Sequence, residues 1–266
     1  MRPSLFLIGV GFVTNFLDAL GIGSFATTTA AFKVSGTVAD ERIPGTLNVG
    51  GSIPGLVEAA IYITVISVDR LTLWSLIAAA VVGAWLGAGV VSRWPRRRVQ
   101  RGMALALLLT GVFTALRLLH LFPAGSDALG LSGGRLAVAV VANGVFGALM
   151  TLGVGLYAPC MGTVALLGMN PAAAFPIMMG SCAFLMPVAS VRFIRAGAFD
   201  RRAALGIALG GVPGVVLAAW LVRSLPLDAV RWLVVVVVLY TAVTMWRSSL
   251  SKTPATRAVL LADKSV

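Results

Sequence analysis

Long apolar runs separated by short polar segments dominate the chain. A membrane-spanning helix needs about 20 apolar residues, and runs of that order recur from one end to the other. They cover approximately 4–32, 43–68, 71–92, 102–122, 134–169, 171–194, 203–223 and 229–246. Little chain is left between them for a soluble domain. The pattern therefore predicts an all-α polytopic membrane protein.

Glycine and proline interrupt several of these runs at matched places. Each half opens with a Gly-x-Gly, and each is followed by a second cluster of glycine or proline, so that breaks are expected at 21–23, 48–55, 153–155 and 180–187. Within a helix, glycine costs about 1 kcal/mol and proline about 3 kcal/mol. Irregular backbone at membrane depth must be buried in protein or line a wet cavity. We expect unwound or re-entrant backbone at these places, and close packing through small residues is the competing interpretation.

The second half of the chain resembles the first at an offset of 132 and then 131 residues. The matched pairs include Gly36 with Gly168, Pro44 with Pro176, Asp69 with Asp200, Gly83 with Gly214, and Pro95 with Pro226. Two nearly equal halves with breaks at matched positions are typical of transporters built from structural repeats.

The arginines indicate how these halves are oriented. Segment 93–101 is strongly basic in the first half, whereas segment 192–202 is the basic one in the second half, so the basic bias changes loops between halves. Because basic loops stay in the cytoplasm, this pattern predicts inverted repeats with both segments in the cytoplasm. Inversion needs an odd number of crossings per half, so one of the four runs in each half is expected to be re-entrant.

Composition excludes several other classes of protein. The chain has 266 residues, of which 59% are hydrophobic and 11% charged, and a net charge of +12. The basic residues lie between apolar runs rather than in a soluble module, so we expect no nucleic-acid binding. One histidine and two isolated cysteines offer no metal or nucleophile constellation, so we expect no enzyme, metal or cofactor.

The Gly-x-Gly breaks are the candidate binding site. A broken helix exposes backbone N–H groups and a positive dipole end, which suit an oxyanion. The candidate substrate-binding residues are Gly21, Gly23, Ser24, Thr27, Thr28, Gly153, Gly155, Tyr157 and Ser181. Two embedded carboxylates, Asp18 and Glu58, are candidates for gating or proton uptake, because charges inside a membrane are costly and usually functional. The repeat counterpart of Asp18 is Met150.

The layout resembles the TauE/SafE family of sulfite exporters over residues 5–246. The resemblance rests on Leu20-Gly21-Ile22-Gly23 with Gly36, and on Leu152-Gly153-Val154-Gly155 with Pro159, Gly168 and Ala172-Ala173-Ala174. Family members carry a richer glycine run after the first Gly-x-Gly, where this chain has Ser24 and Leu156. The resemblance implies export of sulfite or an organosulfonate by a multi-pass protein of the cell (inner) membrane.

The sequence thus predicts two transmembrane repeats, 1–122 and 123–246, and a disordered cytoplasmic tail, 247–266. The expected partners are a small anionic solute and the lipid bilayer, and a homodimer is the assembly left open. Uptake of a sulfonate or other small anion, a proton- or cation-coupled permease using the two carboxylates, and a scaffold subunit are the alternatives. The repeated breaks disfavour a scaffold, which has no reason to keep them.

Overall fold

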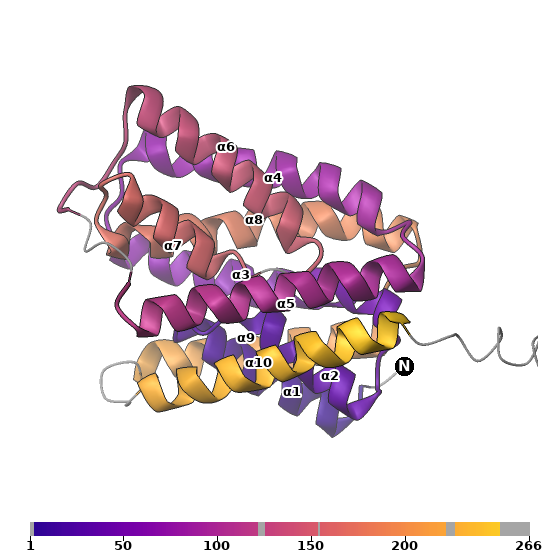
Figure 1. The fold of residues 1–266 in the computed structure, drawn as a ribbon. Coiled ribbons are helices and arrows are strands. Elements are labelled where there is room, and N and C mark those ends of the chain that lie inside the picture. Colours follow the sequence, from indigo (N-terminus) through magenta and orange to yellow (C-terminus); the bar gives the residue numbers. More distant parts are fainter. Residues whose placement is uncertain (1–2, 122–125, 154, 222–226, 251–266) are drawn as a thin grey trace, which may run out of the picture.

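The protein is helical throughout the described ranges, which are 3–121, 126–153, 155–221 and 227–250 of a computed structural model (Figure 1). No strand occurs within these ranges. The helices are α1 (Leu5–Ala19), α2 (Ser24–Ser35), α3 (Ile43–Val65), α4 (Arg70–Val91), α5 (Arg96–Leu118), α6 (Gly133–Met150), α7 (Tyr157–Leu166), α8 (Ala174–Arg195), α9 (Arg201–Leu221) and α10 (Leu227–Leu250). Short 3-10 turns, Asp40–Arg42 and Pro171–Ala173, precede α3 and α8.

The expected apolar runs all coincide with helices. Run 4–32 overlaps α1 and α2, run 134–169 overlaps α6 and α7, and each other run overlaps one helix. Among the described helices, five are long and apolar enough to cross a membrane, namely α4, α5, α6, α8 and α9. The prediction of an all-α polytopic protein is confirmed at this level.

The expected breaks at 48–55 and 180–187 are wrong. Helices α3 and α8 run without interruption through these segments, with Pro54 and Pro187 inside them. Their glycines permit close packing instead: a Cβ built on Gly50 would lie 2.8 Å from Ile207 Cβ, and one built on Gly180 would lie 2.7 Å from Ile77 Cδ1. Here the competing interpretation of small residues at helix interfaces holds.

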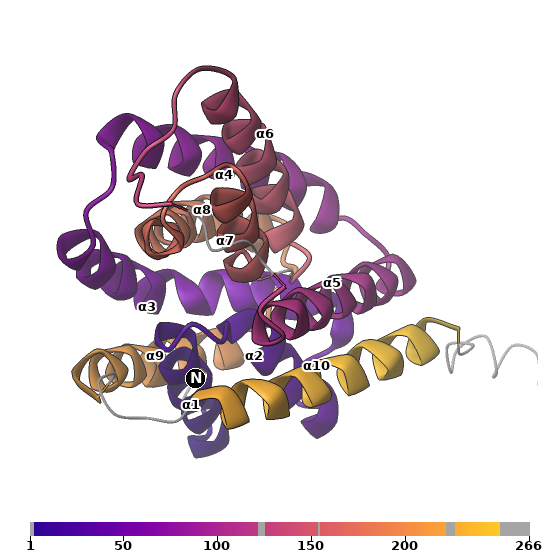
Figure 2. The same ribbon diagram turned by 60° about the vertical axis from the view of Figure 1, so that its left-hand side comes forward.

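Helices from the two halves interleave rather than forming separate bundles. Helix α1 packs on α9 and α4 on α6, while α3 packs on α8 and α5 on α10 (Figures 1 and 2). Glycines bring the first two pairs into backbone contact, since a Cβ on Gly11 would lie 2.6 Å from Ile207 Cα, and one on Gly87 would lie 2.7 Å from the Ala148 carbonyl oxygen. The predicted division at residue 122 is therefore a division of the sequence and not of the packed structure.

Residues related by the repeat take the same local roles. Asp69 accepts a hydrogen bond from the Thr72 amide at the start of α4, and Asp200 accepts one from the Ala203 amide at the start of α9. Gly36 follows α2 with φ +64°, and Gly168 follows the end of α7 with φ +85°. Glycine is favoured at both because the left-handed region is strained for other residues.

Both basic segments lie at one end of the molecule, which we call the basic end and define by residues 36–46, 93–101 and 192–202. Asp40 joins the first two segments, because it contacts Lys33 Nζ at 2.8 Å, Arg96 at 3.5 Å and Gln100 Nε2 at 2.6 Å. The Asp200 amide donates a hydrogen bond to Thr46 Oγ1 at 2.9 Å, which joins segment 192–202 to segment 36–46. The opposite end contains 66–72, 126–133 and 167–175, which are linked by hydrogen bonds from the amides of Asp69 and Asn170 to the loop at 128–129.

Asp40 is the electrostatic centre of the basic end. Burial by itself raises the pKa of its carboxyl group, but hydrogen bonds from Lys33 and Gln100 and the charges of Lys33 and Arg96 outweigh burial, so the pKa lies below its usual value. The ionised carboxylate therefore holds the end of α2, the start of α3 and the start of α5 together.

The carboxyl-terminal helix extends beyond the expected repeat. Helix α10 ends at Leu250, so residues 247–250 of the predicted tail are helical. The rest of that tail, 251–266, lies outside the described residues.

Candidate functional site

The first Gly-x-Gly separates α1 from α2. Helix α1 ends at Ala19, and turn hydrogen bonds from the Gly21 and Ile22 amides to the carbonyls of Asp18 and Leu17 close it. Gly21 has φ +79° and Gly23 has φ +91°. These backbone conformations are strained for any residue that carries a side chain. The expected break at 21–23 is thus confirmed, and the backbone conformation explains both glycines.

Asp18 closes this break by capping the next helix. Its Oδ1 accepts a hydrogen bond from the Ser24 amide at 2.9 Å, and its Oδ2 accepts one from Ser24 Oγ at 2.6 Å. A carboxylate at a helix N-terminus binds otherwise unsatisfied amides and complements the helix dipole. Both Asp18 and Ser24 are therefore engaged with each other, which gives each of these candidates a structural role.

Glu58 lies on α3, one turn before the residue that contacts the end of α1. Its side chain is 2% exposed, and its Oε1 has no hydrogen-bond partner among the described residues. The Tyr62 hydroxyl, one turn further along α3, donates to the Ala19 carbonyl and ties α3 to the end of α1. The two candidate carboxyl groups therefore lie on segments that the Tyr62 hydrogen bond holds together.

The second Gly-x-Gly separates α6 from α7. Helix α6 ends at Met150, Gly153 has φ +99°, and α7 begins at Tyr157. Val154 and the side chain of Tyr157 lie outside the described residues. The expected break at 153–155 is confirmed by these helix ends.

Each break belongs to a hairpin that returns to the end where it began. Helix α1 starts beside the first turns of α9 at the basic end, since Leu7 contacts Gly206, and α2 returns there with Lys33 on Asp40. Helix α6 starts at the opposite end, and its following turn reaches α5, where Leu152 contacts Gly102. Helix α7 then returns to the opposite end, where Ser126 Oγ donates to the Gly168 carbonyl.

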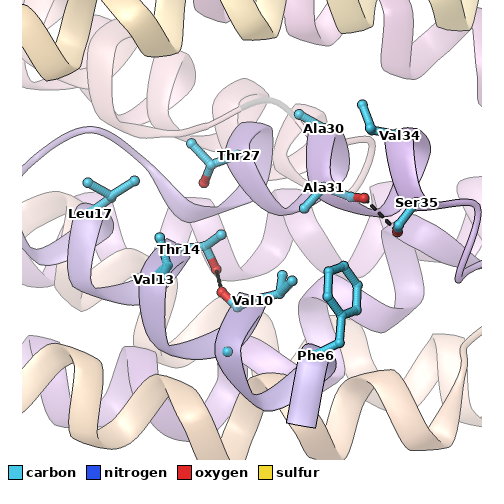
Figure 3. A pocket seen from close by; sticks show the side chains of 11 residues that line it. Phe6, Val10, Val13, Thr14, Leu17, Thr27, Ala30, Ala31, Val34 and Ser35 are labelled. Carbon is cyan, nitrogen blue, oxygen red and sulfur yellow. Dashed lines mark hydrogen bonds between the residues drawn. The ribbon is translucent and has the colours of Figure 1, made fainter. Parts of the chain in front are cut away.

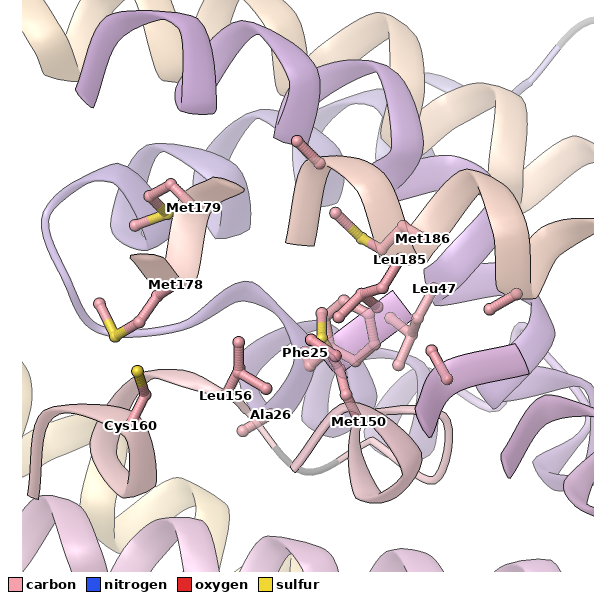
Figure 4. Packing of buried hydrophobic residues seen from close by; sticks show 14 of the residues in the cluster. Phe25, Ala26, Leu47, Met150, Leu156, Cys160, Met178, Met179, Leu185 and Met186 are labelled. Carbon is pink, nitrogen blue, oxygen red and sulfur yellow. The ribbon is translucent and has the colours of Figure 1, made fainter. Parts of the chain in front are cut away.

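The two hairpins meet in the interior. A Cβ built on Gly153 would lie 4.0 Å from Thr29 Oγ1 of α2, and one built on Gly155 would lie 3.9 Å from Thr110 Cγ2 of α5. Phe25 and Ala26 at the start of α2 share a packed cluster with residues flanking the second break, including Leu156 (Figure 4). The break in one half therefore faces helices of the other half.

The threonines of α2 differ in whether their hydroxyls already have hydrogen-bond partners. Thr27 Oγ1 donates within its own helix to the Gly23 and Ser24 carbonyls, and Thr28 Oγ1 donates to Thr14 Oγ1 at 2.9 Å. Thr29 is fully buried, and its hydroxyl has no partner in the described part of the chain. The α2 hydroxyl that faces the second break is thus that of Thr29.

Thr110 is a second available hydroxyl that sequence reasoning missed. It lies on α5, is 8% exposed, and its Oγ1 has no partner in the described ranges. The available signal was a hydroxyl in an apolar helix together with a matching Thr241 at the repeat offset of 131.

Ser181 does not lie at either break. It is fully buried in the middle of α8, where it accepts a hydrogen bond from Asn143 Nδ2 at 3.1 Å, and the same amide donates to the Leu76 carbonyl at 2.7 Å. These bonds join α8, α6 and α4, so Ser181 helps to hold the helices rather than completing the break.

A groove between α1 and α2 is the most evident hollow near the first break, with a volume of about 680 Å³ (Figure 3). Its lining is almost entirely apolar and includes Phe6, Val13 and Leu17. Two of its hydroxyls are used within the helices, because Thr14 donates to the Val10 carbonyl and Ser35 to the Ala31 carbonyl. Such a lining suits hydrocarbon and offers nothing to replace the water of an anion.

The fold and these interior breaks define a class: a polytopic helical membrane protein with two broken-helix hairpins that meet in its core. The model of one family, the sulfite exporter TauE/SafE family, matches residues 136–262. The match extends over nearly the whole second half and agrees with the resemblance found in the sequence. The matching family is one of membrane transporters. No curated protein and no solved structure matches the chain.

Proposed function

We propose that the protein exports a small sulfur oxyanion, sulfite or an organosulfonate, across the cell membrane by alternating access. The observation that carries this proposal is the meeting of two broken-helix hairpins, at Gly153 and Thr29, in a chain that matches a transporter family. Unwound backbone at the centre of a helical bundle supplies donors that can replace the hydration of an anion.

The proposed architecture is a pair of inverted repeats. Exchanging α1–α5 for α6–α10 leaves the helix pairing unchanged: α1 on α9 becomes α6 on α4, α3 on α9 becomes α8 on α4, and the pairs α3–α8 and α5–α10 map onto themselves. The exchange also moves loops to the opposite end, since the turn before α3 lies at the basic end and the turn before α8 lies at the other. Both observations support a two-fold axis in the membrane plane.

The hairpins α1–α2 and α6–α7 are the proposed re-entrant elements. Each returns to its own end. The crossings proposed are therefore the three remaining helices of each half, α3 to α5 and α8 to α10. An odd number of crossings is what inversion requires. In this arrangement the basic end faces the cytoplasm, in keeping with the positive-inside rule.

The substrate site is proposed to lie between the two breaks. Gly21, Gly23 and Gly153 have positive φ at these breaks, and the absence of their side chains allows a ligand to approach the backbone. An inside-negative potential favours anion exit by about 2.3 kcal/mol per charge for each 100 mV. Export of such an anion therefore needs no coupling ion.

The proposal is tested by ligand-dependent stability. The purified protein is heated with sulfite, thiosulfate, sulfate or small sulfonates, with chloride at equal ionic strength as control. A ligand at 100 times its dissociation constant stabilises by about 2.7 kcal/mol, so sulfite or a sulfonate should raise the unfolding midpoint above the chloride control. No response to any of these anions would contradict a sulfur oxyanion as substrate.

A proton-coupled transporter is the second candidate, and the buried Glu58 favours it. Glu58 and Asp18 lie near each other. Among the described residues, neither of them forms an ion pair with a Lys or Arg. Burying two uncompensated charges is costly, so at least one proton is expected there. The test is sulfite flux with and without a pH gradient: Glu58→Gln should abolish stimulation by the gradient if the proton is coupled, and unchanged stimulation would remove this candidate.

A further inference from the structure

The two breaks are related by the repeat but differ in what occupies them. Asp18 closes the first, with both carboxylate oxygens on Ser24 at the start of α2. Its repeat counterpart is Met150, and the residue before α7, Leu156, makes no side-chain capping hydrogen bond. The N-terminus of α2 thus already holds a carboxylate, while that of α7 has none from the part of the chain that the structure describes.

The surroundings of the second break supply an independent sign of a ligand. The nearest atom of Thr29 to Gly153 is its hydroxyl oxygen, and that hydroxyl is fully buried without a partner in the described part of the chain. Thr110, beside Gly155, also has a buried hydroxyl without a partner there. An unsatisfied buried hydroxyl costs about 1–3 kcal/mol. A ligand bound at the second break would satisfy the hydroxyl of Thr29, and it would also satisfy that of Thr110, whose Cγ2 is the atom nearest Gly155.

We propose, on the basis of the proposed function above, that the oxyanion binds at the second break only, at the N-terminus of α7, with the Thr29 and Thr110 hydroxyls as its side-chain donors. Asp18 then acts as an internal carboxylate that closes the first break. The two halves pair their helices in the same way, but the proposed site is asymmetric. Met150 and Met161 in the second half stand where the first half has Asp18 and Thr29.

The chemistry of this site selects a monoanion. Segments 24–32, 102–116 and 150–163, which surround the second break, contain no Lys or Arg. A helix N-terminus contributes only about half a unit of positive charge, and hydroxyls contribute none. The apolar Met103 also lies beside Gly153. A singly charged sulfonate or bisulfite, with a less costly dehydration than a dianion, therefore fits better than sulfate.

The test measures affinity from ligand-dependent unfolding midpoints, using methanesulfonate and sulfate as probes at matched ionic strength. Thr29→Val and Thr110→Val each remove one hydroxyl at nearly constant volume, and should weaken methanesulfonate binding roughly tenfold, as the loss of one hydrogen bond to a charged group predicts. Thr29→Ser keeps the hydroxyl and should restore binding. Thr114→Val is the matched control, because Thr114 lies one turn further along α5 and its hydroxyl already bonds to the Thr110 carbonyl.

The outcomes separate the site from the function. Weaker binding in both valine variants, with Thr114→Val and Thr29→Ser like wild type, supports the asymmetric site. Wild-type affinity in Thr29→Val and Thr110→Val overturns the site while leaving anion transport intact. Tighter binding of sulfate than of methanesulfonate overturns the preference for a monoanion. A wild-type protein that neither binds nor transports any of these anions overturns the proposed function and the site with it.

Discussion

Gly9 and Gly11 lie two residues apart on α1 and provide a matched test of the packing that holds the first hairpin. A Cβ built on Gly11 would lie 2.6 Å from Ile207 Cα and 2.8 Å from two carbonyl oxygens of α9. A Cβ on Gly9 would meet nothing within 4 Å. Backbone atoms cannot move aside as a flexible side chain can, so Gly11→Ala must push α1 away from α9.

The expected difference between the two variants follows from two opposing terms. Replacing glycine with alanine in a helix gains up to about 1 kcal/mol in propensity, and both variants share this gain. Overpacking at a tight contact costs typically about 1–3 kcal/mol, and only Gly11→Ala has this cost. Gly9→Ala should therefore be as stable as wild type or more so, while Gly11→Ala should be roughly 1–3 kcal/mol less stable than Gly9→Ala.

The measurement is the thermal unfolding midpoint of each purified variant in the same detergent. For a chain of this size, 1 kcal/mol corresponds to roughly 2–4 °C, so a gap of several degrees is expected between the two variants. Equal midpoints for Gly9→Ala and Gly11→Ala would refute the close approach of α1 to α9. The placement of the first hairpin against α9 would then be wrong.

Three further predictions address the topology and the charged residues. Cysteines introduced at Arg97 and Arg201 should be labelled from the cytoplasm and one at Leu129 from outside; labels for the first two on opposite faces would remove the inverted arrangement. The folded pKa of Asp40 is lowered, so its contribution to stability is present above the unfolded pKa of about 3.9 and is lost as pH falls through the folded value. The loss in midpoint caused by Asp40→Asn should accordingly be larger at pH 6 than at pH 3, and an equal loss at both would contradict an ionised Asp40. Asp18→Ala should lower stability by about 0.5–2 kcal/mol as a lost helix cap, with Asp18→Asn closer to wild type, and proton uptake by Asp18 would appear as an altered pH profile of flux in Asp18→Asn.

The sequence predicted the helices and the first break in each half because these depend on local features. Membrane-length apolar runs need no partner to be recognised, and Gly21, Gly23 and Gly153 sit in backbone conformations that favour glycine. The same residue types at 48–55 and 180–187 have another cause, since Gly50 and Gly180 accommodate neighbouring helices. A linear sequence does not distinguish a glycine needed for its φ from one needed for space.

The candidate site was predicted in part for a similar reason. The link between Asp18 and Ser24 spans six residues and follows from helix capping, but the proximity of Thr29 and Thr110 to the second break depends on the packing of α2 and α5. Ser181 has the right chemistry but lies on α8 with Asn143. Hydroxyl content alone therefore could not select the residues that face the break.

The contacts of individual glycines also change which control variants are suitable. From the sequence, Gly102 and Gly206 are positions away from the breaks where added bulk should be mild. In the fold, however, a Cβ on Gly206 would lie 2.6 Å from Leu7 Cβ, and one on Gly102 would lie 3.0 Å from Leu152. Bulk at either position would disturb a hairpin, whereas the open surroundings of Gly9 make it the better control.

The most direct test of the central claim is the flux of labelled sulfite through proteoliposomes under an imposed inside-negative potential. Wild-type protein should release sulfite faster than empty liposomes, and the potential should accelerate release. Gly23→Leu and Gly155→Leu should abolish this flux, because bulk at either break blocks the proposed path, while Gly9→Leu should retain it when flux is normalised to folded protein. Normal flux in both break variants, or no sulfite flux in wild type, would contradict an oxyanion path between the two breaks.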